Sequence, residues 1–304
     1  MRARYPDEFG YVRRAGVDLY YEVFGTQRPT VLFLPTWSLV HSRIWKAQVP
    51  YLARHFRVVA FDGRGNGKSS RPTDGAAYSF QELVDDALAV MDETATSQAV
   101  IVGYSIGGIV AAMLAANHAK KVEAAIFIAP VAPFGAPLLE RTVHSFDDEL
   151  ATTDGWAKHN RHYWQRNYED WLAFFAARVI TEPHSTKQRE DVIEWGRETT
   201  PDVLIATYDA PESSGQPPSD RAKSPAYYAR IRCPVLVIHG TGDVVVSHAA
   251  GEGIARASSG SLVTIEGGGH APHCREPVKV NILIRDFIES LPKRRFAPAE
   301  PSRT

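Results

Sequence analysis

The chain has 304 residues, of which 44% are hydrophobic and 23% are charged, and its formal net charge is −1. This ordinary globular composition excludes a disordered, collagen-like or coiled-coil protein, and the balanced charge lacks the basic surplus of a nucleic-acid binder. The length favours one large α/β domain, or a domain with an insertion, over three separate modules.

Targeting and redox features are few. No apolar run reaches the roughly 18 residues that a membrane-spanning helix needs, and the N-terminus lacks the apolar stretch of a signal peptide. The chain has two cysteines, Cys233 and Cys274, which could form at most one disulfide, too few to stabilise a fold of this size. We therefore expect free thiols and a cytoplasmic protein; a single disulfide between the two cysteines is the alternative.

Short apolar runs predict eight strands. Two antiparallel strands, Tyr11–Arg14 and Val17–Phe24, flank the turn residues Ala15 and Gly16. The other six runs are compact and apolar, as expected for parallel strands that are buried on both faces. They are Thr30–Leu34, Arg57–Phe61, Ala99–Gly103, Ala124–Ile128, Val235–His239 and Ser261–Ile265.

Three segments have helical features. Apolar residues recur at helical spacing in Ser79–Thr94, with Ser79 placed as an N-cap. Ile106–Asn117 is rich in Ala, Ile and Met and predicts a buried helix, and Pro277–Leu291 predicts a closing helix with proline in its first turn. The order of strands and helices predicts an α/β fold with a doubly wound, mostly parallel, eight-stranded sheet.

The stretch 131–231 interrupts this order, because it contains many aromatic residues and no convincing strand. Four aromatic residues follow a helical spacing and share one predicted helix face: Trp164, Tyr168, Trp171 and Phe175. Residues 211–225 are rich in Pro, Ser and Gly and predict a loop. We expect a core of residues 1–130 and 232–296, a helical insertion over 131–231, and a disordered tail over 297–304.

The motif Gly103-Tyr-Ser105-Ile-Gly107 joins a predicted strand directly to a predicted helix. Glycines two residues before and after Ser105 let the backbones pass closely at a sharp turn. The turn places the serine hydroxyl at a helix N-terminus, where the helix dipole favours developing negative charge. The motif predicts a nucleophilic serine; the alternative is a helix N-cap in a glycine-rich turn.

A serine hydroxyl needs a base to remove its proton, and an acid and a histidine follow Ser105 in the chain. Asp243 and His270 both lie in glycine-containing loops directly after predicted strands, at the sheet edge where parallel sheets place their sites. Asp243 would fix the imidazole tautomer, and His270 would act as general base and then as acid. Taken singly, Asp243 could form a turn and His270 could be a surface residue, but the order of all three favours a triad.

Other motifs have weaker claims. His270 and His273 could suggest a metal pair, but no Cys or carboxylate cluster completes a site and a proline lies between them. His239, inside a predicted strand, is more typical of a buried structural residue. Asp62–Ser69 lacks Walker A spacing, so we expect a tight loop whose backbone is tied by Asp62 and Arg64. We expect no cofactor and no metal.

Together these motifs resemble those of the α/β-hydrolase fold family over about residues 17–292. The supporting stretches are Asp62-Gly-Arg-Gly-Asn-Gly-Lys-Ser, Gly103-Tyr-Ser-Ile-Gly-Gly, Gly240-Thr-Gly-Asp and Gly268-Gly-His270, with Glu276-Pro277 after it. The resemblance implies a triad of Ser105, Asp243 and His270, and a lid at 131–231. The serine nucleophile is unlike the aspartate of haloalkane dehalogenases and epoxide hydrolases.

One motif departs from the family pattern. Members usually carry His-Gly after the third strand, whereas this chain has Leu34-Pro35-Thr36-Trp37. By position, the resemblance implies an oxyanion hole formed by the backbone amides of Trp37 and Ile106. This variant, with Thr181-Glu-Pro-His-Ser-Thr-Lys in the insertion, is similar to hydrolase domains that are sometimes fused to nucleotide-cyclase domains.

The sequence thus predicts a serine hydrolase that cleaves an ester, thioester or lactone of a small, fairly apolar substrate through an acyl-enzyme on Ser105. As substrate-binding side chains we expect Trp37, Tyr104, Trp164 and Trp171; packing within the insertion is the alternative for the last two. Alternative functions are a C–C bond hydrolase, an acyltransferase or cyclase of the same fold, a metalloenzyme, and a ligand-binding protein with a vestigial triad. We expect a small-molecule substrate and no nucleic-acid or membrane partner; the sequence does not predict the oligomeric state.

Overall fold

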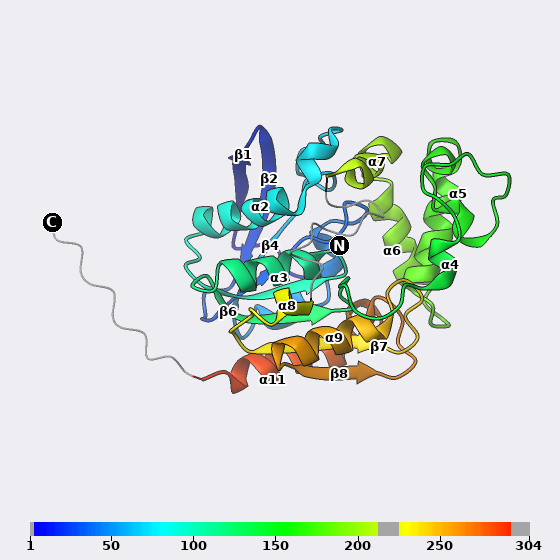
Figure 1. Cartoon of the computed structure of the whole chain (residues 1–304). Helices are drawn as coiled ribbons and strands as arrows, with labels where there is room; N and C mark the ends of the chain where they lie inside the picture. The colour runs from blue at the N-terminus through cyan, green and yellow to red at the C-terminus, as the bar shows by residue number, and fades with distance from the viewer. Residues whose placement is uncertain (1–2, 212–224, 293–304) are drawn as a thin grey trace.

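The computed structural model describes residues 3–211 and 225–292, and its centre is an eight-stranded sheet (Figure 1). The strand order is β1-β2-β4-β3-β5-β6-β7-β8. β2 pairs antiparallel with both β1 and β4, and the remaining pairs are parallel. The mostly parallel sheet that the sequence predicts is therefore confirmed.

The strand bounds agree with the predicted runs to within a few residues. They are β1 (Glu8–Arg14), β2 (Val17–Phe24), β3 (Thr30–Phe33), β4 (Arg57–Phe61), β5 (Ala99–Tyr104), β6 (Val122–Ile128), β7 (Val235–Gly240) and β8 (Ser261–Ile265). β1 begins earlier than predicted because its pairing with β2 continues back to Glu8, opposite Val23. Ala15 and Gly16, both at positive φ, form the turn between these strands.

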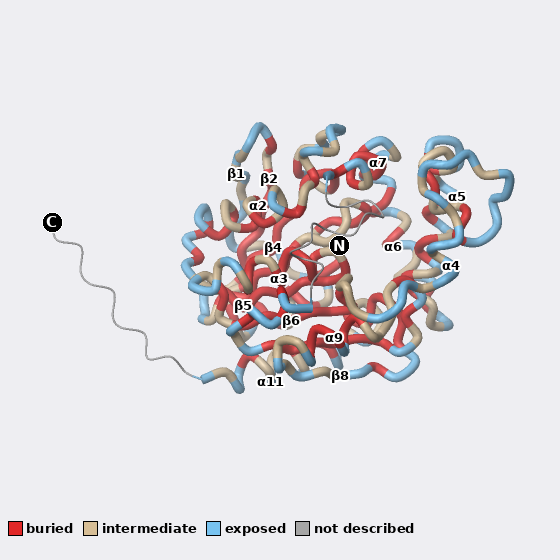
Figure 2. The backbone as a smooth tube through the Cα atoms, in the orientation of Figure 1, coloured by how far each residue is buried: buried red, intermediate tan, exposed pale blue. Residues whose placement is uncertain are grey.

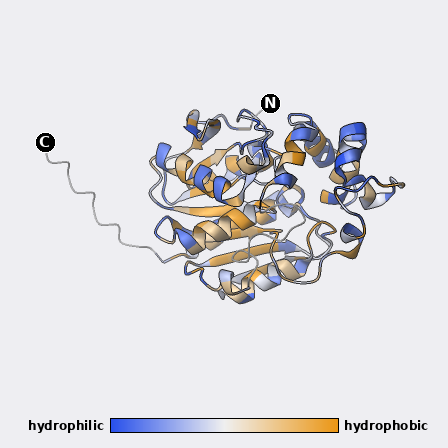
Figure 3. Ribbon diagram, turned by 45° about the horizontal axis from the view of Figure 1, so that its top comes forward, coloured by the Kyte–Doolittle hydropathy of each residue, from blue (hydrophilic) through white to orange (hydrophobic). Residues whose placement is uncertain are grey.

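Alternate residues of the central strands enter two different cores, one on each face of the sheet. In β5, Val100 and Val102 belong to one core and Ala99 and Ile101 to the other. Because both faces are buried, most positions of these strands are apolar. Figure 2 shows the buried residues concentrated along the strands, and Figure 3 shows the same strands as hydrophobic.

Helices cover both faces of the sheet. One core includes residues of α2 (Phe80–Glu93), α3 (Gly107–Asn117), α8 (Pro225–Tyr228) and α9 (His248–Ser258). The other includes residues of α1 (Val49–Leu52) and α11 (Pro277–Ser290), with α10 (Pro272–Arg275) packed against it. The Ser79 side chain caps α2 by accepting from the amide of Glu82, and Pro277 occupies the first turn of α11, both as predicted.

In its described residues, the chain between β6 and β7 consists of helices joined by loops. It contains α4 (Leu139–Thr142), the 3₁₀ helix η3 (Gly155–Lys158), α5 (Arg161–Val179), α6 (Thr186–Gly196), α7 (Pro201–Asp209) and α8. In Figure 1, α4 to α7 lie together beyond the sheet, on the right. Two further 3₁₀ helices, η1 (Ser42–Trp45) and η2 (Gly75–Tyr78), lie in loops after β3 and β4. We refer to residues 131–231 as the helical insertion.

Some expectations fall outside the described residues: nearly all of the predicted loop at 211–225, and the tail at 297–304. Cys233 and Cys274 are free, as predicted. None of the helices in the described part of the chain combines the length and hydropathy needed to cross a bilayer.

Candidate active site

Ser105 occupies the sharp turn between β5 and α3. Its φ is +51°, in the left-handed region that costs a non-glycine residue about 1–3 kcal/mol. The turn is held by backbone hydrogen bonds: the Ser105 amide donates to Ile128, and its carbonyl accepts from Gly108 and Val131. Because these hydrogen bonds join Ser105 to the chain around β6 and to the start of α3, the backbone that carries its hydroxyl is held in place.

The two glycines of the motif are required by close contacts. A Cβ atom on Gly103 would lie 2.3 Å from the carbonyl oxygen of Gly107, and one on Gly107 would lie 2.6 Å from the carbonyl oxygen of Pro35. Any side chain at these positions would push backbone away from the turn. Gly107 also brings the loop after β3 against the turn that carries Ser105.

The structure brings together the three residues predicted as a triad. Ser105 Oγ lies 3.0 Å from His270 Nε2, and His270 Nδ1 lies 2.7 Å from Asp243 Oδ2. Asp243 and His270 lie in the loops after β7 and β8, which are joined by a hydrogen bond from the Gly242 amide to the Gly268 carbonyl. All three side chains are buried.

The Asp243 carboxylate accepts four hydrogen bonds. Oδ1 accepts from the amides of Val245 and Val246, at 2.7 and 2.9 Å, and Oδ2 contacts His270 and His239, the latter at 3.0 Å. Burial by itself would raise the pKa of Asp243, but attraction to His270 and the hydrogen bonds from both histidines outweigh it and lower that pKa well below its ordinary value. The carboxylate therefore stays ionised beside His270.

His239 is a contact that sequence reasoning missed. We expected a buried structural histidine, and His239 is fully buried, but its ring also contacts the candidate acid. The four-residue spacing from His239 to Asp243 was a usable signal, since it spans the end of β7 and the start of the loop that turns back over it.

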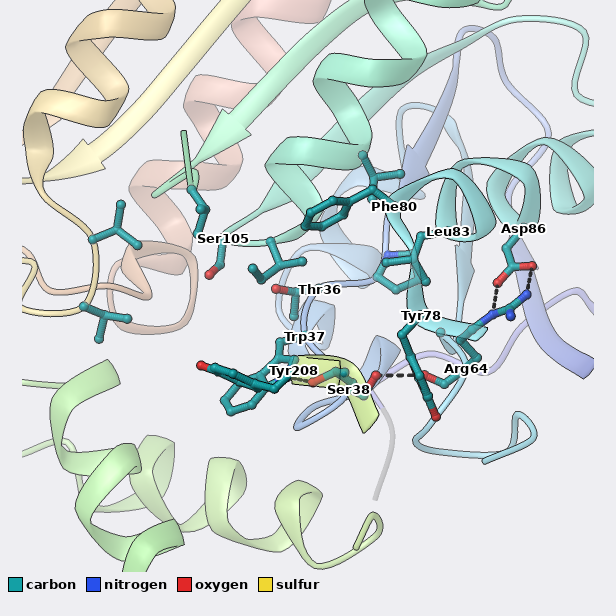
Figure 4. Close-up of a pocket in the computed structure, with 18 of the residues that line it drawn as sticks. Thr36, Trp37, Ser38, Arg64, Tyr78, Phe80, Leu83, Asp86, Ser105 and Tyr208 are labelled. Carbon is teal, nitrogen blue, oxygen red and sulfur yellow. Dashed lines mark hydrogen bonds and ion pairs between the residues drawn. The ribbon is translucent and has the colours of Figure 1, made fainter. Parts of the chain in front are cut away.

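A cavity of about 120 Å³ opens beside Ser105. That volume has room for on the order of ten water-sized groups. Its wall on the core side is largely apolar, with Phe61, Phe80, Leu83, Val110 and Val245. Figure 4 shows Ser105 with its hydroxyl at one end of the cavity, facing the side on which Thr36 lies.

The helical insertion supplies another part of the cavity wall. Arg141, His159, Phe175, Thr207 and Tyr208 all line it. Of these five, only Phe175 belongs to the aromatic stripe that the sequence offered for a pocket. The other four come from three separate segments of the insertion, and no sequence spacing connects those segments.

The backbone amides predicted for the oxyanion hole belong to residues that line the same cavity, Trp37 and Ile106. Neither amide donates a hydrogen bond to another residue within 3–211 and 225–292. The Trp37 side chain is held by a 2.8 Å hydrogen bond from its indole nitrogen to Thr207 Oγ1. Two free donors therefore lie on the wall of the cavity that Ser105 enters.

Of the four predicted substrate-binding residues, one lines this cavity and three do not. Trp37 lines the cavity, but Tyr104, Trp164 and Trp171 do not. The rings of Trp164 and Trp171 are fully buried behind Trp37, each 5.8 Å from it between ring centroids. Tyr104 packs against His270 and His273. The packing alternative describes the aromatic stripe better, although its last member, Phe175, does line the cavity.

The predicted role of Arg64 also needs correction. Asp62 ties the glycine-rich loop as expected, by accepting from the amides of Ser42 and Lys68. Arg64 instead binds Asp86 of α2 through two hydrogen bonds, at 2.7 and 2.6 Å. The guanidinium reaches away from its own loop because the buried carboxylate offers two acceptors in matching geometry.

The metal interpretation of His270 and His273 finds no ligands to support it. Among the described residues, no three His, Cys, Asp or Glu side chains are grouped so as to hold an ion. The His273 ring is buried between Trp45 and Tyr104.

Comparison with known proteins agrees with this architecture. The family model described as alpha/beta hydrolase fold matches residues 29–277. The chain is 29% identical over 290 residues to a bifunctional esterase/perhydrolase DCH of Acinetobacter calcoaceticus, covering 92% of this chain and 100% of that protein. It is 28% identical over 277 residues to a pimeloyl-acyl-carrier protein methyl ester esterase of Aromatoleum aromaticum, covering 86% and 98%.

Solved structures show the same fold. The crystal structure of an enol-lactonase from Burkholderia xenovorans superposes with a TM-score of 0.74 at 22% identity, covering 92% of this chain and 100% of that one. The family model covers most of this chain, and the two curated relatives match it over nearly their full length. The chain therefore belongs to the α/β-hydrolase fold family, and it is a hydrolase.

Proposed function

We propose that the chain is a serine hydrolase that cleaves an ester, thioester or lactone of a small, fairly apolar substrate through an acyl-enzyme on Ser105. One observation carries the proposal: Ser105, His270 and Asp243 form a continuous chain of hydrogen bonds, 3.0 and 2.7 Å long, at the wall of a largely apolar cavity. Relatives named as esterases support the same class of reaction.

In the first half of the reaction, Ser105 Oγ attacks the substrate carbonyl while His270 Nε2 takes the hydroxyl proton. Asp243 accepts from His270 Nδ1, which leaves Nε2 as the nitrogen that faces the serine. The ionised carboxylate also stabilises the imidazolium that forms. His270 then gives the proton to the leaving alcohol or thiol, and the acyl group stays on Ser105.

In the second half, His270 removes a proton from water, which attacks the acyl-enzyme and frees the acid. The negative charge on the carbonyl oxygen in both halves is stabilised by the amides of Trp37 and Ile106. Their lack of another acceptor in the described structure supports this role. An oxyanion donor of this kind typically contributes about 10²–10³ in rate.

The size of the cavity supports a small substrate. Its volume of about 120 Å³ suits a short acyl or alcohol chain. Residues of the helical insertion form part of its wall, and we assign the insertion the role of a lid over Ser105. The valine and phenylalanine side chains on the core side would contact the apolar part of the substrate.

The test combines activity with covalent labelling. Wild-type protein should hydrolyse 4-nitrophenyl butyrate, and a fluorophosphonate should add its mass to the tryptic peptide that contains Ser105. Ser105→Ala should abolish labelling and lower kcat by several orders of magnitude with an unchanged melting temperature. Asp243→Asn should lower kcat by about 10³–10⁴, because the imidazole loses its fixed tautomer. Ser97→Ala, at an exposed serine, is the matched control.

Two experimental outcomes would contradict the proposed function. A folded wild-type protein that takes no label on Ser105 and has no esterase activity would be a binding protein with the geometry of a triad. Labelling of Ser105 without release of acid to water would instead favour acyl transfer.

A further inference from the structure

Three charged side chains line the cavity: Arg64, Asp86 and Arg141. The first two neutralise each other at the end of the cavity away from Ser105 (Figure 4). Asp86 also accepts from Arg14, which is paired with Glu82. Asp85 lies 4.0 Å from Arg14 as well, so the cluster contains two guanidinium groups and three carboxylates, and both of its arginines are paired.

Arg141 has no such compensation. It makes no ion pair with a described carboxylate, and it is the cavity's one uncancelled charge among the described residues that line it. Its guanidinium carbon lies 4.8 Å from the centre of the Trp156 ring, and its Nη1 donates to the carbonyl of Val245. These contacts hold the cation in place and use one nitrogen, which leaves the rest of the guanidinium for a ligand.

The position of Arg141 is tied to the triad. The amide of Val245 donates to Asp243, while its carbonyl accepts from Arg141. The guanidinium therefore lies against the same loop that orients the acid. A ligand on Arg141 would share the cavity with a carbonyl attacked by Ser105.

A second unused donor lies near Arg141. His159 Nε2 and the Tyr208 hydroxyl are 2.5 Å apart, and His159 Nδ1 is buried with no hydrogen-bond partner in the described structure. If the hydroxyl donates to Nε2, then Nδ1 carries a free proton; if Nε2 donates, the hydroxyl proton is free. Both tautomers leave one donor of the pair available. Burial, together with Arg141, lowers the pKa of His159 well below its ordinary value, so the pair remains neutral.

We propose that the substrate carries a carboxylate that binds Arg141 and the free donor of the His159–Tyr208 pair. This inference rests on the proposed function and narrows its substrate to an ester or lactone that bears one free carboxylate. The planar guanidinium matches the two oxygens of a carboxylate. One uncancelled positive charge balances a carboxylate, whereas a phosphate monoester would bring close to two negative charges.

Matched substrates test the proposal. Monomethyl glutarate and monomethyl adipate carry the carboxylate, and methyl 5-methylhexanoate and methyl 6-methylheptanoate replace it with an isopropyl group of similar size. Acid release is followed in a pH-stat. Wild-type kcat/KM should be about 10- to 100-fold higher for the better anionic ester than for its neutral partner, the range for a hydrogen-bonded ion pair.

Variants locate the effect. Arg141→Gln should remove the preference by lowering kcat/KM for the anionic esters about 10- to 100-fold, with the neutral esters changed less than about threefold. Arg141→Lys should keep part of the preference, because lysine retains the positive charge but lacks the paired N–H donors of the planar guanidinium. Arg161→Gln is the matched control: Arg161 also lies over an aromatic ring in the insertion, that of Phe146, but it does not line the cavity. It should leave the preference unchanged.

The outcomes separate the two proposals. A wild-type protein that cleaves neutral esters as well as the anionic ones, or an Arg141→Gln protein that loses both alike, would overturn the carboxylate site and leave the hydrolase intact. If the wild type cleaves neither and Ser105 takes no fluorophosphonate, the proposed function fails. If Arg141→Gln does not fold, inhibition of wild-type 4-nitrophenyl butyrate hydrolysis decides: 5-oxohexanoate should inhibit at least tenfold more strongly than 6-methylheptan-2-one, and equal inhibition would refute the site.

Discussion

His239 and His270 share one oxygen of Asp243: His239 Nε2 lies 3.0 Å and His270 Nδ1 lies 2.7 Å from Oδ2. An ionised carboxylate can only accept, so both rings donate to it. His239 therefore holds its proton on Nε2, and its other nitrogen is buried with no hydrogen-bond partner in the part of the chain that is described. His239 is thus positioned to orient the carboxylate that also binds His270.

Replacing His239 by Phe should lower kcat for 4-nitrophenyl butyrate by about tenfold and leave KM unchanged. The reason is the loss of one hydrogen bond to a charged group, which typically contributes about 1.5–3 kcal/mol. His239→Gln can still donate and should recover part of the rate. Steady-state kinetics at constant pH measure both effects. A Phe variant with wild-type kcat would show that the Val245 and Val246 amides and His270 are sufficient to hold Asp243.

The fold could be predicted because its signals are local. Strands buried on both faces read as unbroken apolar runs, and the turn at Ala15 and Gly16 separates the first two. The helix α9 was not predicted because its sequence contains Gly251 and Gly253, which disfavour a helix. At α9, tertiary packing outweighs this low helix propensity. Gly251 lets the helix approach the His239 ring closely, since a Cβ on Gly251 would lie 2.7 Å from His239 Nδ1.

Part of the candidate site could likewise be predicted from the sequence, and part could not. The proximity of Ser105, Asp243 and His270 could be predicted because each follows a strand and all three strands end at one sheet edge, where topology brings the residues together. The cavity wall could not be identified, because Arg141, His159 and Tyr208 meet only through the packing of the insertion. A sequence pattern carries spacing along one helix; it carries no information on which of several helix faces meet across a cavity.

Gly107→Ala should disturb both stability and rate. The new Cβ would lie 2.6 Å from the Pro35 carbonyl oxygen, so the loop that carries Trp37 must move. We expect unfolding free energy to fall by about 1–3 kcal/mol and kcat to fall by about 10² if the Trp37 amide leaves the oxyanion. Urea denaturation and kinetics give the two numbers.

Gly16→Ala is the control for this substitution. Gly16 has a φ of +78°, and no described atom outside the turn lies within 4 Å of the place that a Cβ would occupy, so alanine there is strained but meets no neighbour. It should cost about 1 kcal/mol and leave kcat unchanged. Equal losses of kcat in the two variants would mean that general destabilisation, and not displacement of the loop, slows the enzyme.

Glu182 of the insertion should affect catalysis through the backbone of the His270 loop. Its Oε1 accepts from the amide of Gly269, at 2.7 Å, one residue before His270. Glu182→Ala removes the acceptor and should lower kcat by about 3- to 10-fold, whereas Glu182→Gln still offers a carbonyl oxygen and should stay within about twofold of wild type. If Gln were as slow as Ala, the charge of Glu182, and not the hydrogen bond, would be the operative feature.

His273 should make the fold sensitive to mild acid. Burial, with a smaller effect from the charge of nearby His270, lowers the pKa of His273 from 6.5 to about 3 in the folded protein. Between these two values the unfolded chain binds a proton that the folded chain does not, so stability falls as pH decreases. The slope for one such histidine is about 1 kcal/mol per pH unit. His159, whose pKa is also lowered, adds to the slope in the same direction.

His273→Phe should remove the His273 contribution, because a phenyl ring can occupy the space between Trp45 and Tyr104, at 4.7 and 4.5 Å, and has no group that takes up a proton on unfolding. Urea denaturation at pH 7.5 and pH 5.0 should show wild type losing about 1–2 kcal/mol more than the variant. Asp243 does not interfere, because its lowered pKa changes stability only below about pH 4. Equal losses in both proteins would mean that His273 takes up its proton without unfolding, and that a water or a shifted side chain reaches its ring in the native state.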